Sequence, residues 1–288
     1  MAWLSKSKAD DFSYTLNSHD FIPVACHYDP NTLMTKNGEL IQIIQIHGIY
    51  SQVVRDDLVN LRNIIRETIR KNIDSDAFAF WIHTIRRKEN LDDPAPYPEL
   101  FSANVHNIWR DKNYWDDKFV NTLYISIVYH KPNLNISSVQ AFMNSLSSGV
   151  LEKFHEDYFA AAATKLCNAV DNILQDLDFF GVRRLGIRTE GDESFSELVF
   201  LFRRIINLNE APMPIPISDL SLSLATHDYV VGNNQIQVKD SKGLIFASIL
   251  SLKEYHEMSS DAIELLLNLP MEFVATEVFH FISKTQAT

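Results

Sequence analysis

The chain lacks the residue pattern that ATP hydrolysis requires. A phosphate-binding loop of the form Gly-x-x-x-x-Gly-Lys-Ser/Thr places backbone amides and a lysine on the phosphates, yet no Gly-Lys dipeptide occurs in the 288 residues. The nearest neighbours, Lys36-Asn37-Gly38 and Lys242-Gly243, have the reverse order. A strand of four apolar residues followed by Asp-Glu, which would hold magnesium, is also missing. We therefore expect no catalytic residues and no nucleotide-binding residues in this chain.

Metal ligands and activated nucleophiles are not clustered either. The ten histidines are scattered, and although His155 opens the pattern His-Glu-x-x-His, Phe159 occupies the second ligand position. The two cysteines, Cys26 and Cys167, lie far apart, which is typical of a chain from a reducing compartment. A lone histidine in a strand, such as His83, is more often a hydrogen-bonded structural residue. We expect no metal and no cofactor in this chain.

One stretch of the chain is basic against an acidic background. The whole chain carries 26 basic and 37 acidic residues, a net charge of −11. Between residues 55 and 88, however, eight basic residues outnumber five acidic ones. Six of the eight form the candidate docking surface: Arg62, Arg66, Arg70, Arg86, Arg87 and Lys88. The first three recur at a spacing of four, so they line one face of a helix, and the other three end the next strand.

Three interpretations of this basic surface stay open. The simplest is a solvated helix face beside a charged strand end. A sharper one is a docking surface for an acidic partner segment or for lipid headgroups. Nucleic acid is the third, although an overall charge of −11 repels phosphate and few aromatic residues interrupt the basic run. If the helix and the next strand pack locally, both basic groups belong to one patch.

Hydrophobic periodicity predicts the elements that would position this surface. Leu58, Leu61, Ile65 and Ile69 recur at spacings of three and four, which predicts a helix over 55–72 with its apolar face on a sheet. Asn-Gly in Lys36-Asn37-Gly38 predicts a hairpin turn. The other expected strands are 32–35, 39–46, 76–86, 120–129, 183–188, 244–252 and 272–282, together with the hairpin 229–231/235–238. The other expected helices are a short one over 99–111, one from near residue 138, a long one over 150–177 and one over 261–268. The capping box Ser194-Phe-Ser-Glu197 opens a further helix that runs to residue 207.

This order of elements predicts the fold class. We expect an α+β protein with mixed, largely antiparallel sheets, β-hairpins and several helices including one long helix. We further expect an N-terminal arm over 1–20, a first α+β lobe over 21–210 and a second, small α+β lobe over 211–288. No signal peptide is expected, and no apolar run reaches the roughly 20 residues of a membrane span.

Five segments, spread in order over nearly the whole chain, are similar to the CagE/TrbE/VirB family, the large ATPases of type IV secretion and conjugation machines. The Trp-Ile-His-Thr-Ile-Arg-Arg block and the Leu-Pro-x-Glu-Phe block are the most specific of the five. The segments are Phe21–Val24, Thr35–Leu40, Trp81–Arg87, Ala247–Tyr255 and Leu267–Phe273.

The resemblance implies a role within such a machine. It identifies the chain with the family's N-terminal domain, which in family members leads to a RecA-like motor that binds ATP and magnesium; the full-length parent would be an ATPase. The implied function is a non-catalytic assembly or docking domain that anchors the motor to the inner-membrane complex and aids oligomerisation. The alternative is a DNA-contacting domain that uses the basic residues Arg62, Arg66, Arg70, Arg86 and Arg87. The implied partners are inner-membrane and channel subunits, and the implied location is cytoplasmic, at the periphery of the bacterial inner membrane.

Overall fold

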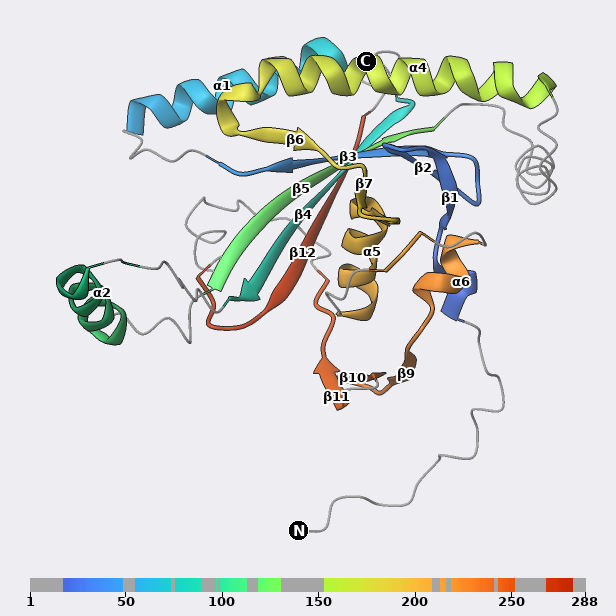
Figure 1. Cartoon of the computed structure of the whole chain (residues 1–288). Coiled ribbons are helices and arrows are strands. Elements are labelled where there is room, and N and C mark those ends of the chain that lie inside the picture. The colour runs from blue at the N-terminus through green and yellow to red at the C-terminus, as the bar shows by residue number, and fades with distance from the viewer. Residues whose placement is uncertain are drawn as a thin grey trace, which may run out of the picture. The chain divides into compact units, whose positions relative to one another are not determined.

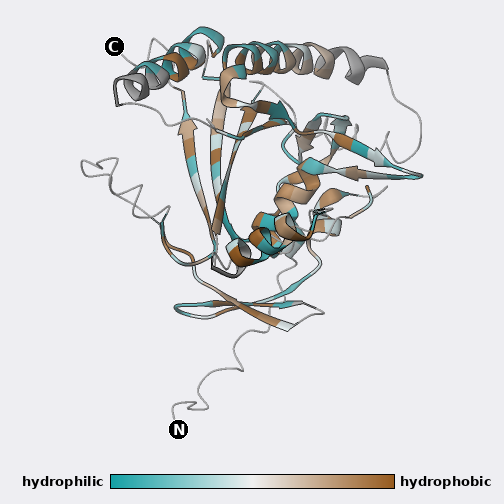
Figure 2. Cartoon of the chain, turned by 60° about the vertical axis from the view of Figure 1, so that its left-hand side comes forward, coloured by the Kyte–Doolittle hydropathy of each residue, from teal (hydrophilic) through white to brown (hydrophobic). Residues whose placement is uncertain are grey.

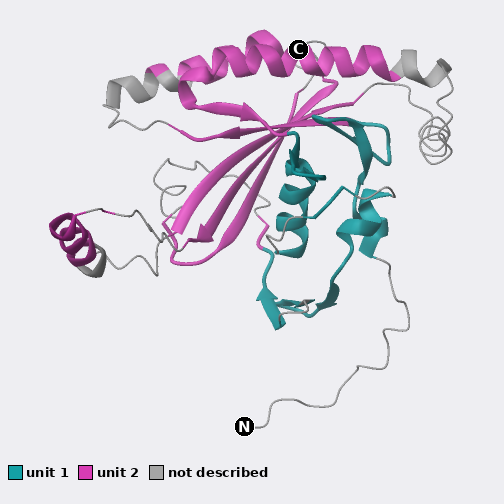
Figure 3. Ribbon diagram, in the orientation of Figure 1, with its two compact units in different colours: residues 1–39, 134–155, 186–249 teal, residues 40–133, 156–185, 250–288 magenta. Residues whose placement is uncertain are grey.

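Two compact units make up the part of the chain that the computed structural model describes (Figures 1 and 3). The described residues are 18–48, 55–73, 76–89, 97, 99–112, 119–130, 153–208, 213–215, 219–240, 243–251 and 268–281. Unit 1 is assembled from residues 1–39, 134–155 and 186–249, and unit 2 from residues 40–133, 156–185 and 250–288. Both units mix helices with antiparallel strand pairs, so the predicted α+β class is confirmed.

Unit 2 is built on one antiparallel sheet with the strand order β6-β3-β5-β4-β12. β5 lies between β3 and β4, and the order β3-α1-β4-β5-α4-β6 is therefore the split β-α-β arrangement of ferredoxin-like folds. β12 is added outside β4. The elements are β3 (Leu40–Ile46), α1 (Arg55–Asn72), β4 (Phe78–Lys88), α2 (Leu100–Lys112), β5 (Phe119–Tyr129), α4 (Lys153–Asp176), the short helix η2 (Asp178–Phe180), β6 (Val182–Arg184) and β12 (Phe273–His280).

The core of unit 2 forms between α4 and the sheet. The long helix has one apolar stripe in its described part, since Ala162, Leu166, Val170, Ile173 and, just after the helix, Leu177 are all buried. The facing strand β3 is buried along six of its seven residues. A helix with one apolar stripe gains most of its stability from such burial, so α4 holds the sheet from one side, next to α1 (Figure 1).

A polar row crosses the three neighbouring strands β12, β4 and β5. His83 of β4 lies with Nδ1 3.0 Å from Oγ1 of Thr276 and with Nε2 3.2 Å from Oγ of Ser126. Figure 2 shows such polar residues interrupting the hydrophobic ones along the long strands. Burial lowers the pKa of His83 from 6.5 to about 4, so the ring is neutral at pH 7. The prediction that His83 is a hydrogen-bonded structural residue is confirmed.

Unit 1 consists of small strand pairs around two helices. A bulged hairpin opens it, and a second hairpin runs directly into α5, which packs on α6. A three-stranded meander, in the order β11-β10-β9, completes it. The elements are the short helix η1 (Ser18–Phe21), β1 (Val24–Asp29), β2 (Thr32–Thr35), β7 (Ile187–Glu190), β8 (Glu193–Ser196), α5 (Glu197–Asn207), α6 (Leu220–Leu224), β9 (Asp228–Val231), β10 (Ile236–Asp240) and β11 (Gly243–Ala247).

Three predicted elements differ in detail from the structure. The strand expected over 244–252 is β11, which ends at Ala247. The expected strand 183–188 is divided into β6 and β7, which pair with different strands. The helix after it is capped by Ser196, whose Oγ accepts a hydrogen bond from the amide of Val199, and not by Ser194. Ser194 is wrong as a cap because it still pairs with Thr189 in the β7–β8 hairpin. The helices expected near residue 138 and over 261–268, and residues 1–17 of the expected arm, lie outside the described residues.

The two units do not follow chain order. Each combines three separate stretches of the chain, and β12 at residues 273–280 pairs with β4 of unit 2 across almost two hundred residues of sequence. The lobes expected from the sequence, 21–210 and 211–288, are each one continuous stretch of the chain. The boundary between them at residue 210 stays a prediction.

Candidate docking surface

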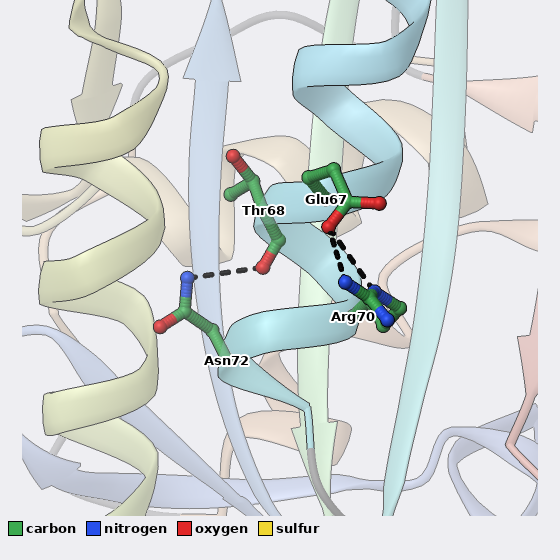
Figure 4. A network of polar contacts seen from close by, with 4 residues as sticks. All are labelled: Glu67, Thr68, Arg70 and Asn72. Atoms are coloured by element: carbon green, nitrogen blue, oxygen red, sulfur yellow. Dashed lines mark hydrogen bonds and ion pairs between the residues drawn. The ribbon is translucent and has the colours of Figure 1, made fainter.

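α1 carries the first half of the candidate docking surface on its outer face. The helix runs from Arg55 to Asn72, as the sequence predicted. Arg66 and Arg70 are exposed, and Arg70 forms an ion pair of 2.7 Å with Glu67 one turn earlier (Figure 4). Arg62 belongs to the same helix, but its side chain lies outside what the structure describes. An exposed ion pair of this kind contributes little to stability. Arg66 and Arg70 are both available on the surface because their side chains are exposed.

The inner side of α1 fixes this orientation. Thr68 is buried at 4% exposure and Ile73 at 8%. Nδ2 of Asn72 donates to the carbonyl oxygen of Thr68 at 3.0 Å and to Oδ2 of Asp176 in α4 at 3.1 Å. Figure 4 shows Asn72 directed to one side of the helix and the Glu67–Arg70 pair to the other. Arg70 therefore points away from α4.

The apolar face of α1 is narrower than its periodicity indicates. Ile65 is 37% exposed and Ile69 is half-buried, although both were expected to pack on the sheet. Ile64 is exposed as well, at 45%. In the turn where Ile69 was expected to be the buried residue, the smaller Thr68 is buried instead. The other two predicted core positions, Leu58 and Leu61, have side chains outside the described set.

The second half of the candidate docking surface is engaged in the fold of unit 2. Nε of Arg86 donates to the carbonyl oxygen of Leu269 at 2.7 Å, and Nη1 donates to Oδ1 of Asn121 at 3.0 Å. The Arg86 guanidinium also lies 4.8 Å from the ring centre of Phe119. These contacts connect β4 to β5 and to the segment that precedes β12. Arg86 thus has a structural role in unit 2, and its part in docking stays a prediction.

The two residues after Arg86 are also tied to nearby acids. Arg87 forms an ion pair of 3.2 Å with Glu89. The backbone amide of Lys88 donates to Oε1 of Glu272 at 2.8 Å, while its side chain is exposed. Lys88 is the last residue of β4, at the end of the strand that points away from α1 (Figure 1). The structure therefore does not unite the two basic groups into the single patch that local packing suggested.

Two aspartates of the long helix α4 form contacts with neighbouring elements. Asp176 accepts the bond from Asn72 and lies 3.4 Å from Nζ of Lys71, which joins the ends of α1 and α4. Asp171 forms an ion pair with Arg184 of β6. Both aspartates are charged residues on a helix, and the sequence signals their position but not the distant cations that they contact.

The described residues contain no group of three or more His, Cys, Asp or Glu arranged to hold a metal ion. Burial, with a smaller contribution from Asp219, raises the pKa of the Cys26 thiol to about 12, which keeps the thiol protonated and unreactive at pH 7. Within the part of the chain that the structure covers, no helix has the length and apolar composition needed to cross a bilayer.

Two family models match separate parts of the chain. Residues 31–135 match the N-terminal domain of the type IV secretion system ATPase VirB4/TrbE. Residues 183–288 match the CagE, TrbE, VirB family, described as a component of the type IV transporter system. The first match covers the strands and helices of the split β-α-β core up to β5, and the second covers β7 to β12.

Curated proteins from several bacteria align with nearly the whole chain. The type IV secretion system protein virB4 of Bartonella henselae and the protein virB4 of Agrobacterium fabrum are each 21% identical over 93% of this chain. The PtlC homolog of Bordetella bronchiseptica is 21% identical over the same share. The alignments cover 34%, 33% and 32% of these relatives, so the chain spans about a third of their length. The chain belongs to the CagE/TrbE/VirB family of type IV transporter components and corresponds to the N-terminal region of its VirB4/TrbE ATPases.

Proposed function

We propose that this region is an assembly domain that attaches a type IV secretion ATPase to the inner-membrane complex and helps its subunits to associate. It takes no part in catalysis, and ATP and magnesium bind elsewhere in the full-length protein. Its working position is the cytoplasmic face of the bacterial inner membrane, next to membrane and channel subunits. The observation that carries the proposal is the exposed basic face of α1 on a chain with a net charge of −11.

The physical argument rests on which basic residues are exposed. Arg86 is held by three contacts within unit 2, whereas Arg66 and Arg70 point into solvent from a helix that Asn72 and Asp176 hold in place. A cationic stripe on an anionic body is attracted to negative surfaces in one orientation only. Such charges mainly speed association and set its specificity. An acidic segment of a channel subunit and anionic lipid headgroups both fit this chemistry.

The test compares two triple variants that change the net charge of the chain equally. The first, Arg62→Gln/Arg66→Gln/Arg70→Gln, removes three positive charges from α1. The second, Asn168→Asp/Asn172→Asp/Gln175→Glu, adds three negative charges to the exposed face of α4. Membrane-fraction recovery and co-purification with channel subunits are measured in cells that carry the secretion machine.

The proposal expects the α1 variant to lose most of its membrane recovery while the α4 control stays near the wild-type level. Both variants should unfold at the same denaturant concentration as the wild type, because surface substitutions usually change stability by less than about 0.5 kcal/mol. Equal recovery of the two variants would mean that the stripe is only a solvated helix face.

A further inference from the structure

The connection between β4 and β5 is much longer than the fold needs. The two strands pair over their full length, with Lys88 opposite Phe119, so a loop of about two to five residues would join them. The chain instead places thirty residues there, 89–118, and these contain α2. An insertion of this length at the end of a completed hairpin is typical of a binding or regulatory function.

α2 exposes a continuous apolar stripe. Phe101, Val105, Ile108 and Trp109 recur at the spacing that places them on one side of a helix. They are 78%, 50%, 57% and 49% exposed, respectively. Ala103, Asn107 and Arg110 occupy the opposite side in the helical pattern. Contiguous exposed apolar groups with a polar rim mark interaction sites, and phenylalanine and tryptophan are frequent anchors of such sites.

The length of α2 supports the same conclusion. An isolated helix of 13 residues is marginal in water and depends on packing of its amphipathic face. Two ring contacts lie inside the insertion, with centroids 4.8 Å apart for Tyr97 and His106 and 6.3 Å apart for His106 and Trp109. The second contact involves Trp109 of the stripe, whose side chain is still 49% exposed. A covering surface would stabilise the helix further.

The charge of the insertion selects the covering partner. Residues 89–118 contain seven acidic and three basic residues, in a chain that is already acidic. Anionic lipid and a second copy of this insertion are both repelled by that charge, whereas a cationic helix is attracted. Lysine and arginine are in excess at the cytoplasmic ends of membrane-spanning helices.

We propose that α2 binds, through Phe101, Val105, Ile108 and Trp109, an amphipathic helix rich in lysine or arginine, such as the cytoplasmic end of a membrane subunit. The assignment rests on the proposed function and names a second surface for it. The basic stripe of α1 takes a negative surface, and α2 takes a cationic apolar helix. The two surfaces are tested with different residues and different probes.

The experiment uses the full chain and a labelled amphipathic peptide of leucine and lysine, about four helical turns long. Fluorescence anisotropy compares the wild type with Phe101→Ser/Trp109→Ser. The matched control is Val230→Ser/Phe246→Ser, which removes two equally exposed apolar side chains, 61% and 60%, from β9 and β11. We expect the α2 variant to bind at least about tenfold more weakly and the control to bind like the wild type. The milder variant Ile108→Asn should fall between them.

Three results would overturn the assignment. The first is that the α2 variant and the control bind the leucine–lysine peptide with equal affinity, or that neither they nor the wild type bind it. The second is that the wild type binds a leucine–glutamate peptide as tightly as the leucine–lysine peptide. The third is Trp109-dependent flotation with phosphatidylcholine vesicles or a Trp109-dependent dimer in sedimentation. If the α1 variant loses membrane recovery but the α2 substitutions do not weaken peptide binding, the proposed function is supported and only the assignment of α2 is wrong.

Discussion

β4 and α1 are neighbours in the chain and both are rich in polar and basic residues, yet the structure uses these residues in opposite ways. In β4, His83 and Arg86 connect three strands through hydrogen bonds to Ser126, Thr276 and Asn121. In α1, Arg66 and Arg70 face solvent, and the ion pair that Arg70 forms is with its own helix. The same residue type is therefore a structural group in one element and a surface group in the next.

The difference follows from the geometry of the two elements. A strand inside a sheet has neighbours on both sides, so a long polar side chain at its end reaches donors and acceptors on adjacent strands. A helix on the outside of a sheet buries one stripe and leaves the rest of its circumference to solvent. Basic residues are thus better candidates for docking on such a helix than on a central strand.

The largest expected effect concerns His83. Its pKa is about 4 in the folded chain and 6.5 when unperturbed, so between these values the unfolded chain binds a proton that the folded chain does not. Stability is full above pH 6.5 and falls as the pH drops, by about 3 kcal/mol near pH 4. Urea unfolding across this range should show a shallower pH dependence for His83→Gln than for the wild type. Parallel curves would show that burial of His83 does not set the dependence.

Arg86 comes next in size. Removing it leaves the Leu269 carbonyl and the Asn121 amide without their charged donor, and bonds of this kind contribute about 1–3 kcal/mol. Arg86→Ala should therefore lower the urea midpoint clearly, together with protease resistance of the segment before β12. An unchanged midpoint would place Arg86 among the surface residues and remove the contrast with α1.

The smallest effect is expected at the Glu67–Arg70 pair. Both side chains are largely exposed, at 64% and 79%, and a solvated pair of this spacing contributes at most about 0.5 kcal/mol. The free energy of unfolding of Arg70→Ala, measured by urea, should lie within about 0.5 kcal/mol of the wild-type value. This difference should vanish in high salt. A loss as large as that of Arg86→Ala would mean that α1 depends on its charges for its position.

The sequence predicts individual elements well because their signals are local. The apolar periodicity that includes Ile65 and Ile69 predicts the helix α1. The apolar stripe that includes Leu166 marks the buried side of α4. Strand order is not local. The insertion of β5 between β3 and β4, and the addition of β12 outside β4, depend on pairings between distant segments, which no local pattern signals.

The docking surface shows the same limit at the level of single residues. The spacing of Arg62, Arg66 and Arg70 predicts a helix face, and Arg66 and Arg70 are exposed on one. The partners of Arg86 are Asn121 and Leu269, which lie 35 and 183 residues further along the chain, and no pattern around residue 86 signals them. For residues 99–111 the sequence predicted only a short helix, and periodicity does not distinguish an exposed apolar stripe such as that of α2 from a buried one.

One paired measurement tests the contrast between α1 and β4 most directly. Urea unfolding and membrane-fraction recovery per folded molecule are both measured for Arg62→Gln/Arg66→Gln/Arg70→Gln and for Arg86→Gln. We expect opposite outcomes, with the α1 variant as stable as the wild type but poorly recovered with membranes, and the Arg86 variant less stable but recovered normally. An Arg86 variant of full stability that is lost from the membrane fraction, or an α1 variant that unfolds early and is recovered normally, would contradict the account.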